Sequence, residues 1–175
     1  MQLIRPPLIS KETIQKRVIE LAEEILNDCN YEELHVIIIL RGAIFFAVDL
    51  LRNLPPVNSI DFIKVSSYTG TQSSGKLVVD ILPTDKISQQ HILLVEDIFD
   101  TGLTTSYIKE WVQQQSPKSI KLCVLLEKEK ERNGVNISPD YVGFHIEDKF
   151  VVGYGMDYNG RFRNLSDIYV LEVTE

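Results

Sequence analysis

The sequence predicts an α/β protein in which helices flank a central parallel β-sheet. Short, β-branched apolar segments alternate along the chain with segments whose apolar residues recur at helical spacing. Residues 35–40 are apolar almost throughout, which is typical of a strand covered on both faces of a parallel sheet. The 175 residues fit one domain, and a hydrophobic content of 44% suffices for a sizeable core.

The helices are expected where apolar residues follow the helical period. Ser10 is a suitable N-cap for the first helix, Arg41-Gly42 separates the first strand from the second helix, and Pro55-Pro56 follows that helix. The expected helices cover residues 11–27, 43–52 and 104–115.

The strands are expected where short apolar segments are bounded by turn residues. They cover residues 35–40, 60–65, 77–82, 91–95, 120–126, 141–146, 150–152 and 168–173. Residues 66–75 are rich in Ser, Thr and Gly and predict a loop, and residues 127–138 predict a second, charged loop.

Charge and cysteine content exclude several classes of protein. The formal net charge of -7 argues against nucleic acid or an anionic membrane as a partner, although an anionic small molecule remains open. No segment approaches the roughly 18 apolar residues that a membrane span needs. Cys29 and Cys123 lack metal-ligand spacing and form no disulfide framework, so buried free thiols are expected. We therefore expect a cytoplasmic protein.

The most informative segment is the apolar strand at 91–95 together with the residues that follow it. The adjacent carboxylates Glu96 and Asp97 repel each other, and they suit vicinal hydroxyls bound directly or through Mg²⁺. Residues 100–104 offer hydroxyls and backbone N–H groups at a helix start, which is typical of an anion site. A sugar phosphate fits both parts of this segment, with its hydroxyls on the acids and its phosphate on the turn.

These acids allow two other interpretations. Asp97 and Asp100 could simply cap the next helix, but capping does not explain Glu96. Receiver domains also place an acid pair after a strand, but there the strand lies near the N-terminus. Because ligands of parallel sheets bind beyond the carboxyl ends of the strands, Arg41-Gly42 and Glu127-Lys128 should lie at the same edge as the acids.

The segment Val95–Thr104 resembles the phosphoribosyl pyrophosphate (PRPP) motif of type I phosphoribosyltransferases. Other segments resemble the hypoxanthine-guanine phosphoribosyltransferases, in the same order over nearly the whole chain. These segments are Leu40–Ala43, Ser67-Tyr68, Leu125–Lys128 and Asp148–Tyr158.

The resemblance implies a Rossmann-like core at about residues 10–137 and a small hood from about 1–9 and 138–175. It implies purine salvage, in which PRPP and hypoxanthine or guanine give IMP or GMP and pyrophosphate. It further implies Mg²⁺ as cofactor and a homodimer or homotetramer.

The resemblance also implies roles for the residues that would bind PRPP. Glu96 and Asp97 would hold the ribose hydroxyls and Mg²⁺, and Asp100 would take the purine N7 proton as general base. The 5′-phosphate would be wrapped by Thr101, Gly102, Leu103, Thr104 and Thr105. Some relatives have Lys in place of Leu103. Leucine retains the backbone N–H at this position but lacks the positive charge of lysine.

Pyrophosphate would meet Arg41, Gly42 and Arg163, and the Leu40–Arg41 peptide bond can be cis in this family. Taken alone, Gly42 would indicate only a turn that enters a helix. Ser67 and Tyr68 would belong to a mobile lid that excludes water, although the same composition suits an ordinary hairpin connection.

The purine would be bound by residues of the C-terminal third. Lys128 would donate to the exocyclic O6, with Lys130 as an alternative; Phe150 would stack on the ring, and Val151 would contact its edge. Asp157 would bind a second Mg²⁺ or its waters. Taken alone, Lys128 is typical of a solvated surface charge and Phe150 of a core residue.

Two rival functions are compatible with parts of this sequence. A regulatory relative could retain the fold as a PRPP sensor, and another transferase of the family could use a pyrimidine. The combination of Asp100, Lys128, Phe150 and Asp157, without a basic surplus, argues against the sensor. Lys128 and the segment Asp148–Tyr158 distinguish a purine from a pyrimidine acceptor.

Overall fold

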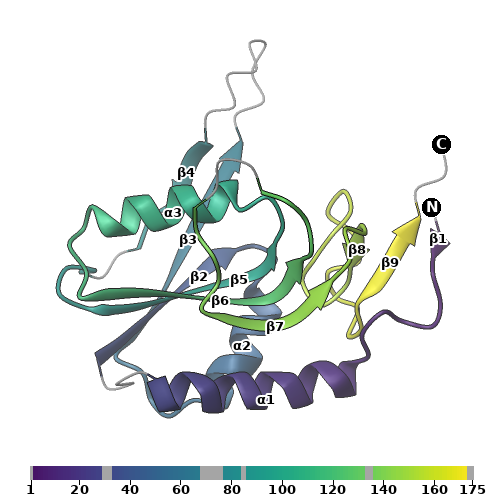
Figure 1. Cartoon of the computed structure of the whole chain (residues 1–175), viewed down its shortest axis with the longest axis horizontal. Helices are drawn as coiled ribbons and strands as arrows, with labels where there is room; N and C mark the ends of the chain where they lie inside the picture. Colours follow the sequence, from purple (N-terminus) through teal and green to yellow (C-terminus); the bar gives the residue numbers. More distant parts are fainter. Residues whose placement is uncertain (1, 29–32, 68–76, 84–85, 133–135, 173–175) are drawn as a thin grey trace.

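The computed structural model describes residues 2–28, 33–67, 77–83, 86–132 and 136–172 (Figure 1). Its main sheet has six strands in the order β4-β3-β2-β5-β6-β7, parallel except for the β3–β4 pair. The strands are β2 Leu34–Leu40, β3 Ser59–Ser67, β4 Leu77–Ile81, β5 His91–Phe99, β6 Ser119–Lys128 and β7 Tyr141–Ile146. The predicted α/β fold is thus confirmed.

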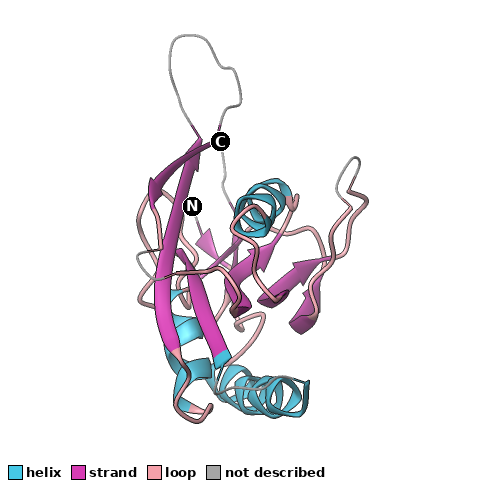
Figure 2. Ribbon diagram, turned by 90° about the vertical axis from the view of Figure 1, so that its left-hand side faces the viewer, coloured by secondary structure: helices cyan, strands magenta, loops and turns pink. Residues whose placement is uncertain are grey.

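Within the described residues, three helices cover the two faces of this sheet (Figures 1 and 2). Helices α1 (Lys11–Asp28) and α2 (Ile44–Arg52) pack on the face that includes Val36 and Val95, and α3 (Leu103–Gln113) packs on the opposite face. Residues alternate between the two core clusters along each strand, so burial on both faces explains the nearly continuous apolar segments. The cap of α1 is present, because Thr13 N–H donates to Ser10 Oγ at 3.3 Å.

A second, antiparallel sheet has the order β1-β9-β8 and lies beside the main sheet in Figure 1. Its strands are β1 Gln2–Leu3, β8 Val151–Val152 and β9 Tyr169–Glu172. It therefore joins the N-terminal segment to the C-terminal third, as a hood built from both would require. The exact division stays a proposal, and β7 pairs with β6 in the main sheet although it follows residue 138.

Three strands extend further at their carboxyl ends than the sequence predicts. β3 continues through Ser66 and Ser67, which were predicted to begin a loop, because both residues pair with β4. β5 continues through the acid pair to Phe99, and β6 includes Glu127 and Lys128, which the sequence analysis assigned to a loop. That assignment was wrong because the parallel pairing continues, with Phe99 opposite Glu127 and Lys128 opposite Ile146. The side chains at the ends of β5 and β6 therefore sit on a regular backbone.

Two predictions from composition concern cysteines and membranes. Cys123 is a buried free thiol, and burial raises its pKa, whereas Cys29 lies outside the described residues. Among the described helices, none is both long and apolar enough to cross a bilayer.

Candidate active site

A cavity of about 290 Å³ opens at the carboxyl ends of β2 and β5. It is bounded by the end of each strand, by the turn that leads into α3, and by two residues of the C-terminal third. The polar and glycine residues that line it are Arg41, Gly42, Glu96, Asp97, Asp100, Thr101, Gly102, Thr104, Thr105, Asp157 and Arg163. Nearly all residues proposed for PRPP thus face one cavity.

Glu96 is the buried member of the acid pair, and only 8% of its surface is exposed. Asp97 N–H donates to Glu96 Oε1 at 3.1 Å. Burial, and next the negative charge of Asp97, raise the pKa of Glu96 well above its ordinary value. Such a pair is best satisfied by hydroxyl donors or a cation, which fits a ligand in the cavity.

Gly42 lets the backbone after β2 approach the acid pair closely. A Cβ atom at this position would lie 1.8 Å from Asp97 Oδ2, and a Cβ at Gly155 would lie 1.9 Å from the Gly42 carbonyl oxygen. The Leu40–Arg41 peptide bond before it is cis. Gly42 is therefore more than a helix-entry turn, because any side chain there would displace the Asp97 carboxylate.

The turn into α3 has the geometry of an anion site. Its N-cap, Gly102, has φ of 77° and no side chain of its own, and Thr101 Oγ1 accepts a long hydrogen bond from Leu103 N–H at 3.4 Å. The alternative that Asp97 and Asp100 serve as helix caps is therefore not supported. Leu103 differs from its neighbours, since 61% of its surface is exposed and it does not line the cavity.

A second cavity, of about 190 Å³, adjoins the first. Its own residues are Lys128, Phe150, Val151 and Met156, and it shares Asp97, Ile98, Asp100 and Asp157 with the first cavity. Phe150 is 47% exposed, contrary to the alternative that it is a core residue, and its ring meets Tyr158 edge-to-face at 5.7 Å. Nearly half of Phe150 is therefore open to a planar ligand in this cavity.

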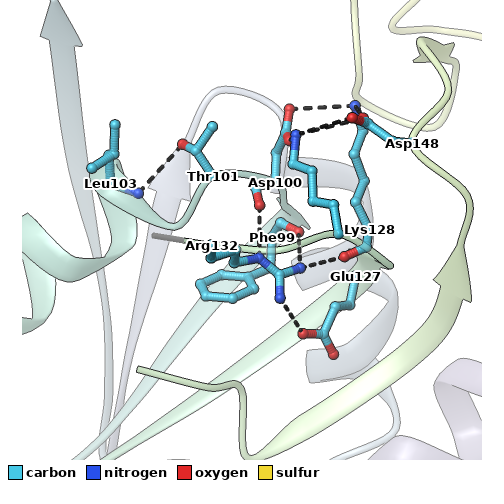
Figure 3. Close-up of polar contacts among 9 residues, drawn as sticks. Phe99, Asp100, Thr101, Leu103, Glu127, Lys128, Arg132 and Asp148 are labelled. Carbon is cyan, nitrogen blue, oxygen red and sulfur yellow. Dashed lines mark hydrogen bonds and ion pairs between the residues drawn. The ribbon is translucent and has the colours of Figure 1, made fainter. Parts of the chain in front are cut away.

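Lys128 is only 8% exposed and thus is not the solvated surface charge that its surroundings in the sequence suggest. Its Nζ atom lies 2.8 Å from Asp148 Oδ1 and 3.3 Å from Asp100 Oδ2 (Figure 3). Lys130 also pairs with both acids but does not line the second cavity. The hydrogen bond from Lys128 lowers the pKa of Asp148, and the hydrogen bond between Lys130 and Asp100 raises the pKa of Lys130.

Asp157 and Arg163 form a pair above the first cavity. One Nη atom of Arg163 lies 2.6 Å from Asp157 Oδ1, and the other donates to the Gly155 carbonyl oxygen at 2.5 Å. Gly160 N–H donates to Asp157 Oδ2 at 2.6 Å. Because both carboxylate oxygens have protein partners, Asp157 is better suited to a cation's water shell than to direct coordination.

The oxygen ligands at this site fit Mg²⁺ in part. Within the described ranges, no three Asp, Glu, His or Cys side chains converge on one point as a complete metal site. Glu96 and Asp97 do offer adjacent carboxylates, and Asp157 lines the same cavity. Mg²⁺ commonly binds with one or two carboxylates, waters and phosphate oxygens, so this set suits an ion that arrives with its substrate.

Three features bear on what the sequence could reveal about the site. The predicted lid begins at Ser67, the last residue of β3, but Tyr68 and the residues to 76 lie outside the described part of the chain. The sequence indicates no role for Asp148, although it begins the segment Asp148–Tyr158 that resembles the family. Arg132 was missed because its contacts are mostly with backbone oxygens, which leave no pattern in the sequence.

Known proteins resemble this chain over most of its length. The phosphoribosyl transferase domain family matches residues 10–159. A hypoxanthine-guanine phosphoribosyltransferase of Aquifex aeolicus is 43% identical over 94% of this chain and 93% of its own length. A hypoxanthine-guanine-xanthine phosphoribosyltransferase of Tritrichomonas foetus is 38% identical over 94% and 90%. A crystal structure of a hypoxanthine-guanine phosphoribosyltransferase from Bacillus anthracis has a TM-score of 0.89 at 40% identity, covering 97% and 99%.

Proposed function

Because the chain belongs to the phosphoribosyl transferase domain family, we propose that it transfers the 5-phosphoribosyl group of PRPP to hypoxanthine or guanine. The products are IMP or GMP and pyrophosphate, and the reaction is a step of purine salvage. One observation carries the proposal: a polar cavity and a cavity with an aromatic wall meet at Asp97 and Asp100. A two-substrate glycosyl transfer needs such a junction.

PRPP would occupy the larger cavity. Glu96 and Asp97 would accept hydrogen bonds from the ribose hydroxyls, and the turn of residues 101–105 would hold the 5′-phosphate at the start of α3. Carboxylates below an oxocarbenium-like ring stabilise the transition state more than the neutral sugar. The acid pair would thus contribute to rate as well as to binding.

Asp100 would act as the general base. It lines both cavities, so its carboxylate lies where a purine in one meets a ribose in the other. It would take the N7 proton while N9 attacks the anomeric carbon and the C1–pyrophosphate bond breaks. Lys128 and Lys130 pair with Asp100 in this structure, and bound purine would rearrange those contacts.

The smaller cavity would hold the purine. Lys128 would donate to O6, and this ammonium has no lone pair to accept from the amino group of adenine, so 6-oxopurines are favoured. Phe150 would stack on the base, and backbone groups of Val151 would contact its edge. Lys128 is preferred to Lys130 because it lines the cavity and is held there by Asp148.

Pyrophosphate would be bound by Arg41, by the backbone at Gly42, and by Arg163. Glu96 and Asp97 would hold Mg²⁺, with Asp157 contacting it or its waters. The ion would neutralise phosphate charge and aid departure of pyrophosphate. Arg41, Arg163 and the ion would together supply the local positive charge that lets an acidic protein bind so anionic a substrate.

The assembly proposed is a homodimer or homotetramer. Ile44, Phe45 and Val48 of α2, and Ile60 and Phe62 of β3, are large apolar side chains with about 40% or more of their surface exposed. Burial against a second copy would remove this surface from water. We also propose a cytoplasmic location, which the unpaired thiol of Cys123 supports.

The proposal is tested by incubating the purified protein with Mg²⁺, PRPP and each of hypoxanthine, guanine, xanthine and adenine. Nucleotide formation from hypoxanthine or guanine, with little from adenine, is expected. The xanthine reaction shows how far the base specificity extends. Binding of PRPP without nucleotide formation from any base would instead favour a sensor.

A further inference from the structure

Arg132 joins two strand ends that carry different parts of the site. It lies four residues beyond the end of β6, and its side chain is 16% exposed. Its guanidinium carbon lies 4.5 Å from the centre of the Phe99 ring, at the end of β5. An arginine in a charged segment is thus held against the sheet edge where both cavities open.

The guanidinium of Arg132 donates to both strand ends (Figure 3). Its Nε atom donates to the Asp100 carbonyl oxygen at 2.8 Å, and one Nη atom donates to the Phe99 carbonyl oxygen at 3.3 Å. The same Nη atom donates to the Lys128 carbonyl oxygen. The other lies 3.1 Å from Glu127 Oε1.

Each acceptor lies on one of the two residues proposed to meet the purine, Asp100 and Lys128, or on the residue directly before it. Asp100 and Lys128 lie on different strands, and their side chains are 3.3 Å apart between Oδ2 and Nζ. Parallel strand ends present carbonyl groups beyond the ladder, and such groups need donors when they are shielded from water. A planar guanidinium with several fixed donors can reach three carbonyls and a carboxylate, which an ammonium cannot do.

We propose that Arg132 is a positioning residue. It fixes the distance between Asp100, in the turn before α3, and Lys128, at the end of β6. This inference rests on the proposed function, because it takes the roles of Asp100 and Lys128 from it. Arg132 contacts neither cavity and would act on the purine only through those two residues. Misplacement of a catalytic or substrate-binding group by about 1 Å can lower the rate on the order of 10²-fold.

Arg17 offers a matched control elsewhere in the fold. It too is a partly buried arginine, and it donates to the carbonyl oxygens of Val142 and Gly143 at 2.8 and 2.9 Å while pairing with Glu24. It lines neither of the two cavities. Loss of its guanidinium should therefore weaken the fold in a similar way without affecting the site.

The experiment compares Arg132→Met, Arg132→Lys and Arg17→Met in the full-length protein. We expect both Met variants to lower Tm. Only Arg132→Met should lower kcat with hypoxanthine at least about tenfold and raise the hypoxanthine KM, with the Kd for PRPP within about twofold of wild type. Arg132→Lys should retain the positive charge but only part of the wild-type kcat, because an ammonium lacks the planar set of N–H donors of a guanidinium.

Several outcomes would overturn the inference. These are wild-type kcat in Arg132→Met, an equal loss of kcat in Arg17→Met, or full activity in Arg132→Lys. If Arg132→Met does not fold, Arg132→Lys against Arg17→Met decides the matter by the same criteria. Nucleotide formation by the wild-type protein is measured before any variant is compared. Its absence would overturn the proposed function and this inference with it.

Discussion

The two cavities of the site are built in different ways. The larger one takes most of its polar groups from ten consecutive residues, 96–105, with Gly42 brought close by the neighbouring strand β2. The smaller one combines Asp100, Lys128 and Phe150 from segments far apart in the chain. The comparison suggests that binding of the sugar phosphate depends on local sequence, whereas base selection depends on how the strand ends are held together.

The largest effect is expected from the residue shared by the two cavities. Asp100→Asn removes the proton acceptor while keeping the side chain's shape, so kcat with hypoxanthine should fall by roughly 10²–10⁴-fold. Steady-state assays measure this, with PRPP binding followed separately. Unchanged turnover would remove the general-base role from Asp100.

The next effect concerns the close approach in the larger cavity. In Gly42→Ala the added methyl group would overlap the Asp97 carboxylate, so kcat/KM for PRPP should fall by on the order of 10²-fold. Gly160→Ala is a useful control, because a Cβ there meets no atom within 4 Å, although its φ of 77° predicts some loss of stability. Equal kinetic losses in the two variants would argue against a specific role for Gly42.

A smaller effect is expected in the second cavity. Lys128→Ala removes the donor to O6, so the preference for hypoxanthine over adenine should fall about tenfold or more, in proportion to the loss of one charged hydrogen bond. Competition between the two bases for PRPP measures the ratio. A similar change in Lys130→Ala, with none in Lys128→Ala, would mean that the wrong lysine has been assigned.

The smallest effect is on stability and depends on pH. Burial raises the pKa of Glu96 in the folded protein, so over the interval above its ordinary value the folded chain binds more protons than the unfolded chain. The free energy of unfolding therefore falls as pH rises through that interval. Glu96→Gln removes this loss, and its Tm relative to wild type should rise by a few degrees between about pH 4 and pH 8. Calorimetric scans showing a constant difference in Tm would contradict this account of Glu96.

The sequence predicted most of the fold because strands buried on both faces leave continuous apolar segments, as in residues 35–40. It also located the acid pair, since Glu96, Asp97 and the turn after them are covalent neighbours. It misplaced Glu127 and Lys128 in a loop because their charges hide the continuing pairing of β6 with β5 and β7. Arg132 could not be found, because hydrogen bonds to backbone carbonyls depend on the fold and on no neighbouring residue type.

The central claim is that the acid pair binds PRPP whereas Lys128 selects the base, and calorimetric titration of PRPP with Mg²⁺ tests it most directly. The double variant Glu96→Ala with Asp97→Ala should weaken PRPP binding at least about tenfold, because it removes the acceptors for the ribose hydroxyls and Mg²⁺. Lys128→Ala should leave the Kd within about twofold of wild type. Unchanged binding in the double variant, or an equal loss in Lys128→Ala, would contradict the account.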